Sequence, residues 1–271
     1  MLRFPARFTA DLTKVLLSQK LFGSAKPPVV LRLNPVEWAA RVDVLPVSPS
    51  SDSNGSSVES SSIVEANQQM LSFIRRSNAP VVWIGGETPL QYPHIGQLTR
   101  GIVKMGRTVF VEKDGRLLRR RIHEFRPVSR LYVTVELNGL EDSHDLRAGH
   151  AGLFRHTLEG VRAAKLSGFL ICVQTKIFED TELSALSLLA KQITKMGADS
   201  WVVTRANDNG SLPDGKIEAA RNLIPSRRWR WFSGLLDRSI APASVTIGET
   251  QTRTTLEARD REEPVAGLRT Q

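Results

Sequence analysis

The chain has 271 residues, of which 41% are hydrophobic, so it can bury a full core as one large domain. No run reaches the roughly 18 to 20 apolar residues of a membrane-spanning helix, and residues 1–12 lack the apolar region of a signal peptide, so we expect a cytoplasmic protein. The formal net charge of +9 favours an anionic partner and does not choose among phosphate, nucleic acid and an acidic membrane surface.

An amphipathic helix is predicted within the amino-terminal residues 1–28. Its apolar residues share one helical face: Phe8, Leu12, Val15, Leu16 and Leu21. We expect this helix to pack on the rest of the domain. The alternative is a peripheral contact of residues 7–22 with the inner face of the membrane.

Residues 29–205 alternate between predicted helices and strands. The strands are rich in Val, Ile and Phe and cover residues 27–33, 80–84, 108–112, 131–137, 169–175 and 200–204. The intervening helices cover residues 63–77, 94–106, 115–125, 152–168 and 182–197. This alternation predicts an α/β domain with a parallel sheet of six strand–helix units. Residues 46–62 are rich in Ser, Asp, Asn and Gly and are expected to form a flexible loop inside the domain.

The stretch "VVWIGGETPL" ends the second predicted strand with Gly85, Gly86 and Glu87. In parallel α/β proteins ligands bind at the carboxyl ends of the strands, where glycines let the backbone approach a ligand closely. Paired glycines are equally typical of a tight turn, and a glutamate in this position can cap the next helix. The motif alone therefore leaves a binding site and a plain turn open.

Beyond the last predicted strand the regular alternation stops. Residues 206–241 are predicted to form a helical extension, and residues 242–271, which are polar and aperiodic, a disordered tail. Within the extension, residues 226–236 interleave arginines with tryptophans. We favour burial of the tryptophans in the core; contact with a membrane interface ranks second, and nucleic-acid binding ranks third.

The pattern resembles the radical S-adenosylmethionine (SAM) enzymes. Four stretches carry this resemblance: "GGE" at the end of the second strand, "VELNGLEDSHDLRAGHAGLFRHTLEGVRAAKLSGF", "PPVVLRLNPVEW" and "VQTKIFEDTE". In their detail they look most like the branch that contains adenosylhopane synthase. The resemblance implies a partial (β/α)6 TIM-type barrel in which Glu87 receives the amino group of SAM and Gln174 faces the cofactor. Glu136 and Asn138, at the end of the fourth strand, are further candidates for this site.

The chain departs from this family at its iron–sulfur motif. The family carries CxxxCxxC after the first strand, and its three thiolates hold a [4Fe-4S] cluster. Here the simplest alignment puts Ala39, Asp43 and Pro46 at the three cysteine positions. The single cysteine, Cys172, lies in an apolar stretch and is predicted to be an inert core residue. The five histidines show no pairing at metal-ligand spacing, so we expect neither the cluster nor reductive cleavage of SAM.

Three functional hypotheses follow from these observations. The first is a cluster-less pseudoenzyme, an accessory or binding protein related to hopanoid biosynthesis, with a lipid or an enzyme as partner and weak binding of SAM. The second is an active radical SAM enzyme that transfers an adenosyl group to a lipid through an unusual or partner-supplied cluster. The third, nucleic-acid binding through basic surfaces, predicts affinity that falls steeply with salt concentration.

Overall fold

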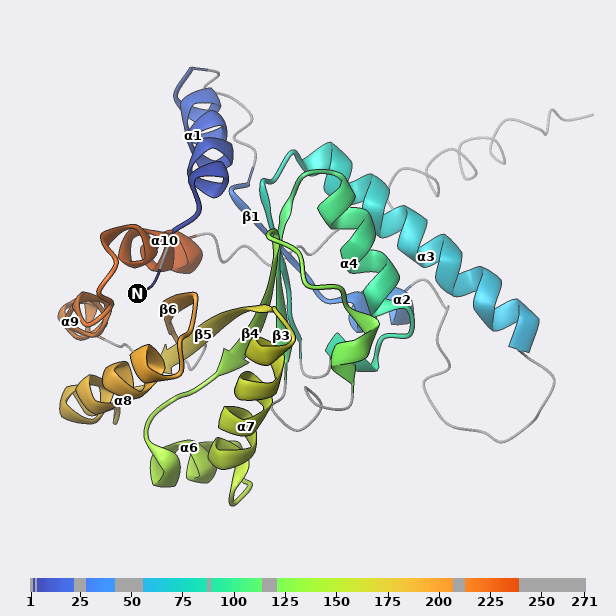
Figure 1. Ribbon diagram of the computed structural model, residues 1–271. Coiled ribbons are helices and arrows are strands. Elements are labelled where there is room, and N and C mark those ends of the chain that lie inside the picture. Colours follow the sequence, from blue (N-terminus) through green and yellow to red (C-terminus); the bar gives the residue numbers. More distant parts are fainter. Residues whose placement is uncertain are drawn as a thin grey trace, which may run out of the picture. The chain divides into compact units, whose positions relative to one another are not determined.

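A single parallel sheet organises the computed structural model, which describes residues 2, 4–21, 28–41, 56–86, 89–113, 121–206 and 213–238. Its strands are β1 (Val30–Leu33), β2 (Val81–Ile84), β3 (Thr108–Lys113), β4 (Leu131–Glu136), β5 (Leu170–Ile177) and β6 (Ser200–Arg205). The strands are hydrogen-bonded in chain order, each parallel to the next. Figure 1 shows this sheet between two groups of helices. The predicted partial (β/α)6 barrel is confirmed.

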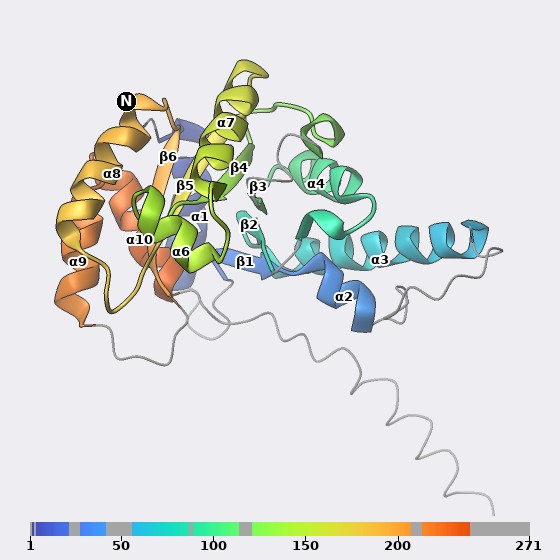
Figure 2. The same ribbon diagram turned by 90° about the horizontal axis from the view of Figure 1, so that it is seen from below.

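The α-helices are α1 (Ala6–Leu21), α2 (Pro35–Arg41), α3 (Ser56–Ser77), α4 (Ile95–Lys104), α6 (Glu141–Ala148), α7 (Leu153–Leu166), α8 (Leu183–Lys195), α9 (Asp214–Asn222) and α10 (Arg227–Arg238). Two short 3₁₀ helices cover Pro89–Gln91 and Ile122–Glu124. None of the helices in the described ranges is both long and apolar enough to cross a membrane. Figures 1 and 2 show α3 and α4 on one side of the sheet and α1 and α10 on the other.

The face of the sheet that α1 and α10 cover begins with a layer of aromatic side chains. Phe110 of β3 stacks between Trp83 of β2 and Tyr132 of β4, with ring centroids 4.9 and 4.7 Å away. Phe8 of α1 and Phe232 of α10 lie 6.2 and 5.7 Å from the Phe110 ring. All five side chains are buried, so two segments from opposite ends of the chain close this part of the barrel.

The amino-terminal helix packs on the domain, which was the favoured prediction. Phe8 and Leu12 are buried, and Asp11 Oδ2 accepts a hydrogen bond of 2.7 Å from Nη1 of Arg130. In α10, Trp229 is buried as predicted, whereas 41% of Trp231 is exposed.

The free edge of β6 is covered by side chains of the helical extension. The backbone N–H of Val203 donates to Ser233 Oγ at 3.1 Å, and that of Arg205 donates to Asp237 Oδ1 at 3.0 Å. Arg221 Nε donates to the Val203 carbonyl at 3.4 Å. Because an unpaired edge strand invites association with other chains, α9 and α10 protect this barrel where the sheet fails to close.

Some segments differ from the sequence-based expectation. Part of the expected loop at 46–62 is helical, because α3 begins at Ser56; serine costs little in a helix that is already nucleated. A second unexpected helix, α2, begins with the pair Asn34–Pro35, where Asn34 Oδ1 accepts the N–H of Glu37 at 3.3 Å as an N-cap. Of the helix expected over 115–125, residues 115–120 lie outside the described residues, Arg121 is helical, and Ile122–Glu124 form a 3₁₀ turn. The predicted tail, 242–271, lies outside the described residues.

Candidate functional site at the strand ends

Polar side chains replace the aromatic layer toward the carboxyl ends of the strands. Side chains two residues apart on a strand share a face of the sheet, so Glu112 follows Phe110 and Glu136 follows Tyr132 and Thr134. The strand register pairs Glu112 with Thr134, and Glu136 with Gln174 of β5. This edge is where parallel α/β barrels bind their ligands.

Gly85 and Gly86 leave room for polar side chains of neighbouring strands. A Cβ atom on Gly85 would lie 2.6 Å from Oε2 of Glu112, and one on Gly86 would lie 2.7 Å from Nδ2 of Asn34. Gly86 also has φ +126°, a conformation that strains residues with a side chain. The backbone conformation therefore favours glycine at Gly86, and a side chain on Gly85 would displace the Glu112 carboxylate, whether or not a ligand binds. Glu87 lies outside the described residues.

Glu112 is a site residue that the sequence analysis missed. The indole Nε1–H of Trp83 donates to its Oε1 at 2.5 Å. Within the described part of the chain its other oxygen has no hydrogen-bond partner. Burial raises the pKa of the Glu112 carboxyl group and outweighs the Trp83 hydrogen bond and the charges of Lys176 and Arg32, which lower the pKa. The sequence signal that could have identified Glu112 is its position two residues after Phe110, on the same face of β3.

Glu136 and Asn138 lie together with Lys176, a second residue that the sequence analysis missed. Glu136 Oε2 and Lys176 Nζ form an ion pair of 2.7 Å, while Asn138 Nδ2 donates to Glu136 Oε1. The side-chain oxygen of Asn138 accepts the backbone N–H of Lys176 at 2.9 Å. Asn138 therefore joins β4 to β5, and its amide oxygen is occupied by the protein itself.

Gln174 lies on the same face as Glu136 and is almost completely buried. Its Nε2 donates to Thr204 Oγ1 of β6 at 3.3 Å, and its backbone carbonyl accepts the N–H of Leu137 at 2.9 Å. The structure thus brings Glu136, Asn138 and Gln174 together and links them to Thr204; their role in binding a cofactor stays a prediction.

The His144–Asp145 pair in the resembling stretch has a local structural role. Asp145 accepts hydrogen bonds from the backbone N–H groups of Phe154, at 2.8 Å, and Gly152, at 2.5 Å, and so caps α7. These bonds, led by that from Phe154, lower the pKa of Asp145. Nδ1 of His144 accepts the N–H of Asn138 at 3.3 Å, and burial lowers the His144 pKa.

The donor set of this chain does not fit an iron–sulfur cluster. Among the described residues no three His, Cys, Asp or Glu side chains converge as metal ligands. Cys172 is fully buried on β5, and burial raises the pKa of its thiol to about 12, so the thiolate ligand is disfavoured. Of the three positions aligned with the missing cysteines, Ala39 is buried in α2, and Asp43 and Pro46 lie outside the described residues.

Comparisons with known proteins identify the fold alone. No family model and no curated protein sequence matches the chain. Solved structures of Streptococcus suis SuiB do match. The structure bound to the precursor peptide SuiA is 11% identical, with a TM-score of 0.50 over 76% of this chain and 45% of SuiB. The structure bound to S-adenosylmethionine is 12% identical, with a TM-score of 0.51 over 73% of this chain and 45% of SuiB.

This chain spans less than half the length of the SuiB structures that it matches. At such low identity the likeness is one of architecture, and it agrees with the six parallel strands in chain order. The chain thus has the partial (β/α)6 barrel fold of the radical SAM kind.

Proposed function

We propose that this chain is a pseudoenzyme of the radical SAM fold, an accessory or binding protein without a [4Fe-4S] cluster of its own. The observation that carries the proposal is the state of Cys172, the single cysteine of the chain. Its thiol is fully buried among the strands, and its pKa is raised to about 12. Since iron in such clusters is held by thiolates, this chain offers no adequate ligand set.

The polar strand ends support a binding role. Glu112 presents a carboxylate oxygen that no described residue satisfies, next to the side-chain-free Gly85. A poorly solvated, unpaired carboxylate is unfavourable, and a cationic group of a ligand would compensate its charge. The ammonium group of SAM has this chemistry, and Gly85, Gly86, Glu87 and Glu112 are the residues that would hold it.

Lipid biosynthesis is the process we propose. The support is the sequence resemblance to the branch that contains adenosylhopane synthase. In this proposal the strand ends hold an apolar lipid or a partner enzyme of hopanoid biosynthesis. SAM binds only weakly there, because the iron that chelates its amino and carboxylate groups is not supplied by this chain.

Calorimetric titration of iron-free protein with SAM tests this role. The expected dissociation constant is weaker than about 1 mM, or about −4 kcal/mol. The proposal is overturned by micromolar affinity that Glu87→Ala and Glu112→Gln abolish, because the site would then be preserved for a non-radical use of SAM. Glu65→Gln is the matched control, since Glu65 is an exposed residue of α3 and should not affect SAM binding.

A further inference from the structure

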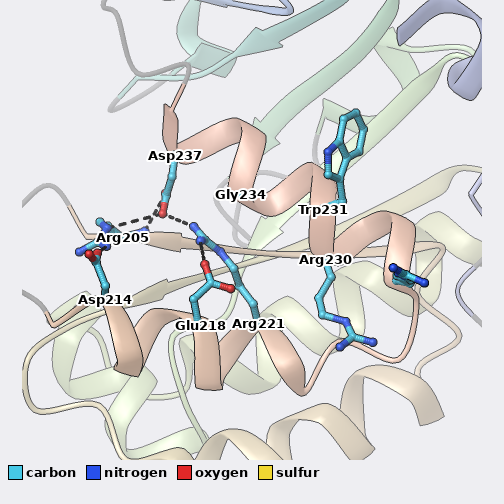
Figure 3. A pocket seen from close by; sticks show the side chains of 9 residues that line it. Arg205, Asp214, Glu218, Arg221, Arg230, Trp231, Gly234 and Asp237 are labelled. Atoms are coloured by element: carbon cyan, nitrogen blue, oxygen red, sulfur yellow. Dashed lines mark hydrogen bonds and ion pairs between the residues drawn. The ribbon is translucent and has the colours of Figure 1, made fainter. Parts of the chain in front are cut away.

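A hollow of about 810 Å³ lies between α9, α10 and the end of β6 (Figure 3). This volume is in the range of small-molecule sites, about 300 to 1,000 Å³. Its charged lining consists of four arginines and three carboxylates: Arg205, Arg221, Arg227, Arg230, Asp214, Glu218 and Asp237. The sequence analysis identified the arginines of α10 but did not predict a pocket beside them.

The acidic residues of the hollow are already paired with two of the arginines. Arg221 donates from Nη1 to Glu218 Oε1 at 2.6 Å and from Nη2 to Asp237 Oδ2, and the Arg221 and Asp237 side chains are only 8% exposed. Arg205 forms an ion pair with Asp214 and lies 3.8 Å from Asp237 Oδ2. Figure 3 shows this network on one side of the hollow. This network sets two guanidinium groups against three carboxylates, and Arg227 and Arg230 bring the lining to a net charge of +1.

The two arginines at the start of α10 are in a different state. Across the described ranges, neither Arg227 nor Arg230 has a carboxylate partner. Arg230 donates from Nη1 to the neutral side chain of Asn222 at 3.1 Å, and its buried Nε has no partner. A buried donor without an acceptor is unfavourable, so the Arg230 guanidinium would gain from an anionic acceptor.

We propose that this hollow binds a phosphate group, carried either by a free phosphate compound or by a lipid headgroup. Two guanidinium groups without carboxylate partners match the charge of a phosphate monoester, about −1.5 to −2 at neutral pH. Guanidinium groups also bind phosphate oxygens through two parallel hydrogen bonds. The net charge of +9 attracts such an anion from a distance.

Trp231 gives the hollow an apolar wall. It is 41% exposed, whereas its neighbours on α10, Trp229 and Phe232, are buried in the aromatic layer. Figure 3 shows Trp231 and Arg230 leaving α10 in opposite directions. Both side chains line the hollow, so it offers an apolar surface apart from the guanidinium groups.

Titration with pyrophosphate tests the site in the full chain. We expect binding to the wild type that weakens at least about tenfold, or about 1.4 kcal/mol, in the double variant Arg227→Gln, Arg230→Gln. Arg228→Gln is the matched control, because Arg228 is an exposed neighbour in the same helical turn and does not line the hollow. If the double variant fails to fold, the single variant Arg227→Gln, at an exposed position, replaces it. We then expect a smaller loss of pyrophosphate affinity that Arg228→Gln does not show.

The proposal is overturned when the wild type does not bind pyrophosphate and its sedimentation with phosphatidic acid vesicles is unaffected by the double variant. It is also overturned when Arg228→Gln weakens binding as much as Arg227→Gln does, since only net charge would then matter. The vesicle measurement also distinguishes the two sources. Sedimentation with phosphatidic acid but not phosphatidylcholine, lost in the double variant, identifies a lipid headgroup; binding of pyrophosphate alone identifies a free phosphate compound.

Discussion

Two successive layers on the same face of the sheet differ in chemistry and in how they are completed. The lower layer holds the stacked rings of Trp83, Phe110 and Tyr132. The upper layer lies two residues further along the strands. There Gly85 follows Trp83, Glu112 follows Phe110 and Thr134 follows Tyr132. Aromatic rings therefore close the barrel toward the amino ends of the strands, and polar groups are left at the carboxyl ends, where ligands bind.

The lower layer depends on segments that are far apart in the sequence. Phe8 and Trp229 belong to α1 and α10, more than 200 positions from each other, and their rings lie 6.0 Å apart. In the described residues the upper layer consists of Glu112 and Thr134 on strands and Gly85 directly after β2, and the hydrogen bond from Trp83 to Glu112 joins the two layers. Stability should therefore reside mainly in the lower layer and binding in the upper one.

The largest expected effect is in the lower layer. Phe110→Ala should lower the free energy of unfolding by about 3–5 kcal/mol, because a fully buried ring with aromatic neighbours on both sides leaves a cavity. Leu146→Ala, at a side chain of α6 that is 83% exposed, should change it by less than about 0.5 kcal/mol. Denaturant unfolding monitored by circular dichroism measures both. Similar losses for the two variants would contradict the assignment of stability to this layer.

The contact between Gly85 and Glu112 gives a smaller effect with a specific rescue. Gly85→Ala should cost about 1–2 kcal/mol, because Trp83 holds the Glu112 carboxylate at the place of the new methyl group. Glu112→Ala in the same chain should recover most of this loss. Gly86→Ala should not be rescued, since its φ of +126° is strained independently of Glu112. Equal rescue of both glycine variants would argue against the contact.

Glu112→Gln should change how stability depends on pH. Because burial raises the pKa of Glu112 in the folded chain, the folded state binds the proton more tightly than the unfolded state. The contribution of Glu112 to the free energy of unfolding is therefore greatest below the pKa that the group has in the unfolded chain. It falls as the pH rises through the pKa of the folded chain. Glu112→Gln should remove this decline in unfolding curves recorded upward from about pH 4, which is near the unfolded pKa of a glutamate. A decline that persists unchanged would contradict the pKa shift.

At Cys172 the expected effect is on chemical reactivity and not on stability. Its fully buried thiol, with a pKa of about 12, should react with a thiol reagent at least about a hundredfold more slowly in the folded chain than in denaturant. Absorbance of the released chromophore measures the rate. Rapid reaction of the folded chain would show that the thiol is available as a ligand.

Local pattern predicted the strands and the glycines at the end of β2, because these follow from the sequence of single strands. Gln174 was selected by the family resemblance and Glu136 by its position at a strand end. Glu112 and Lys176 were missed, since their importance comes from neighbours on other strands: Trp83 for Glu112 and Glu136 for Lys176. The phosphate-binding hollow depends on how α9 and α10 pack beside β6, which no periodicity in the chain encodes.

The central claim is that this barrel carries no iron–sulfur cluster of its own. Anaerobic reconstitution with iron and sulfide, followed by desalting and by iron and sulfide analysis, tests it most directly, with Cys172→Ser alongside. We predict no stoichiometric cluster in the wild type and the same result for Cys172→Ser. A stoichiometric [4Fe-4S] cluster that survives desalting would contradict the account and favour an active radical SAM enzyme, and its loss in Cys172→Ser would identify the ligand.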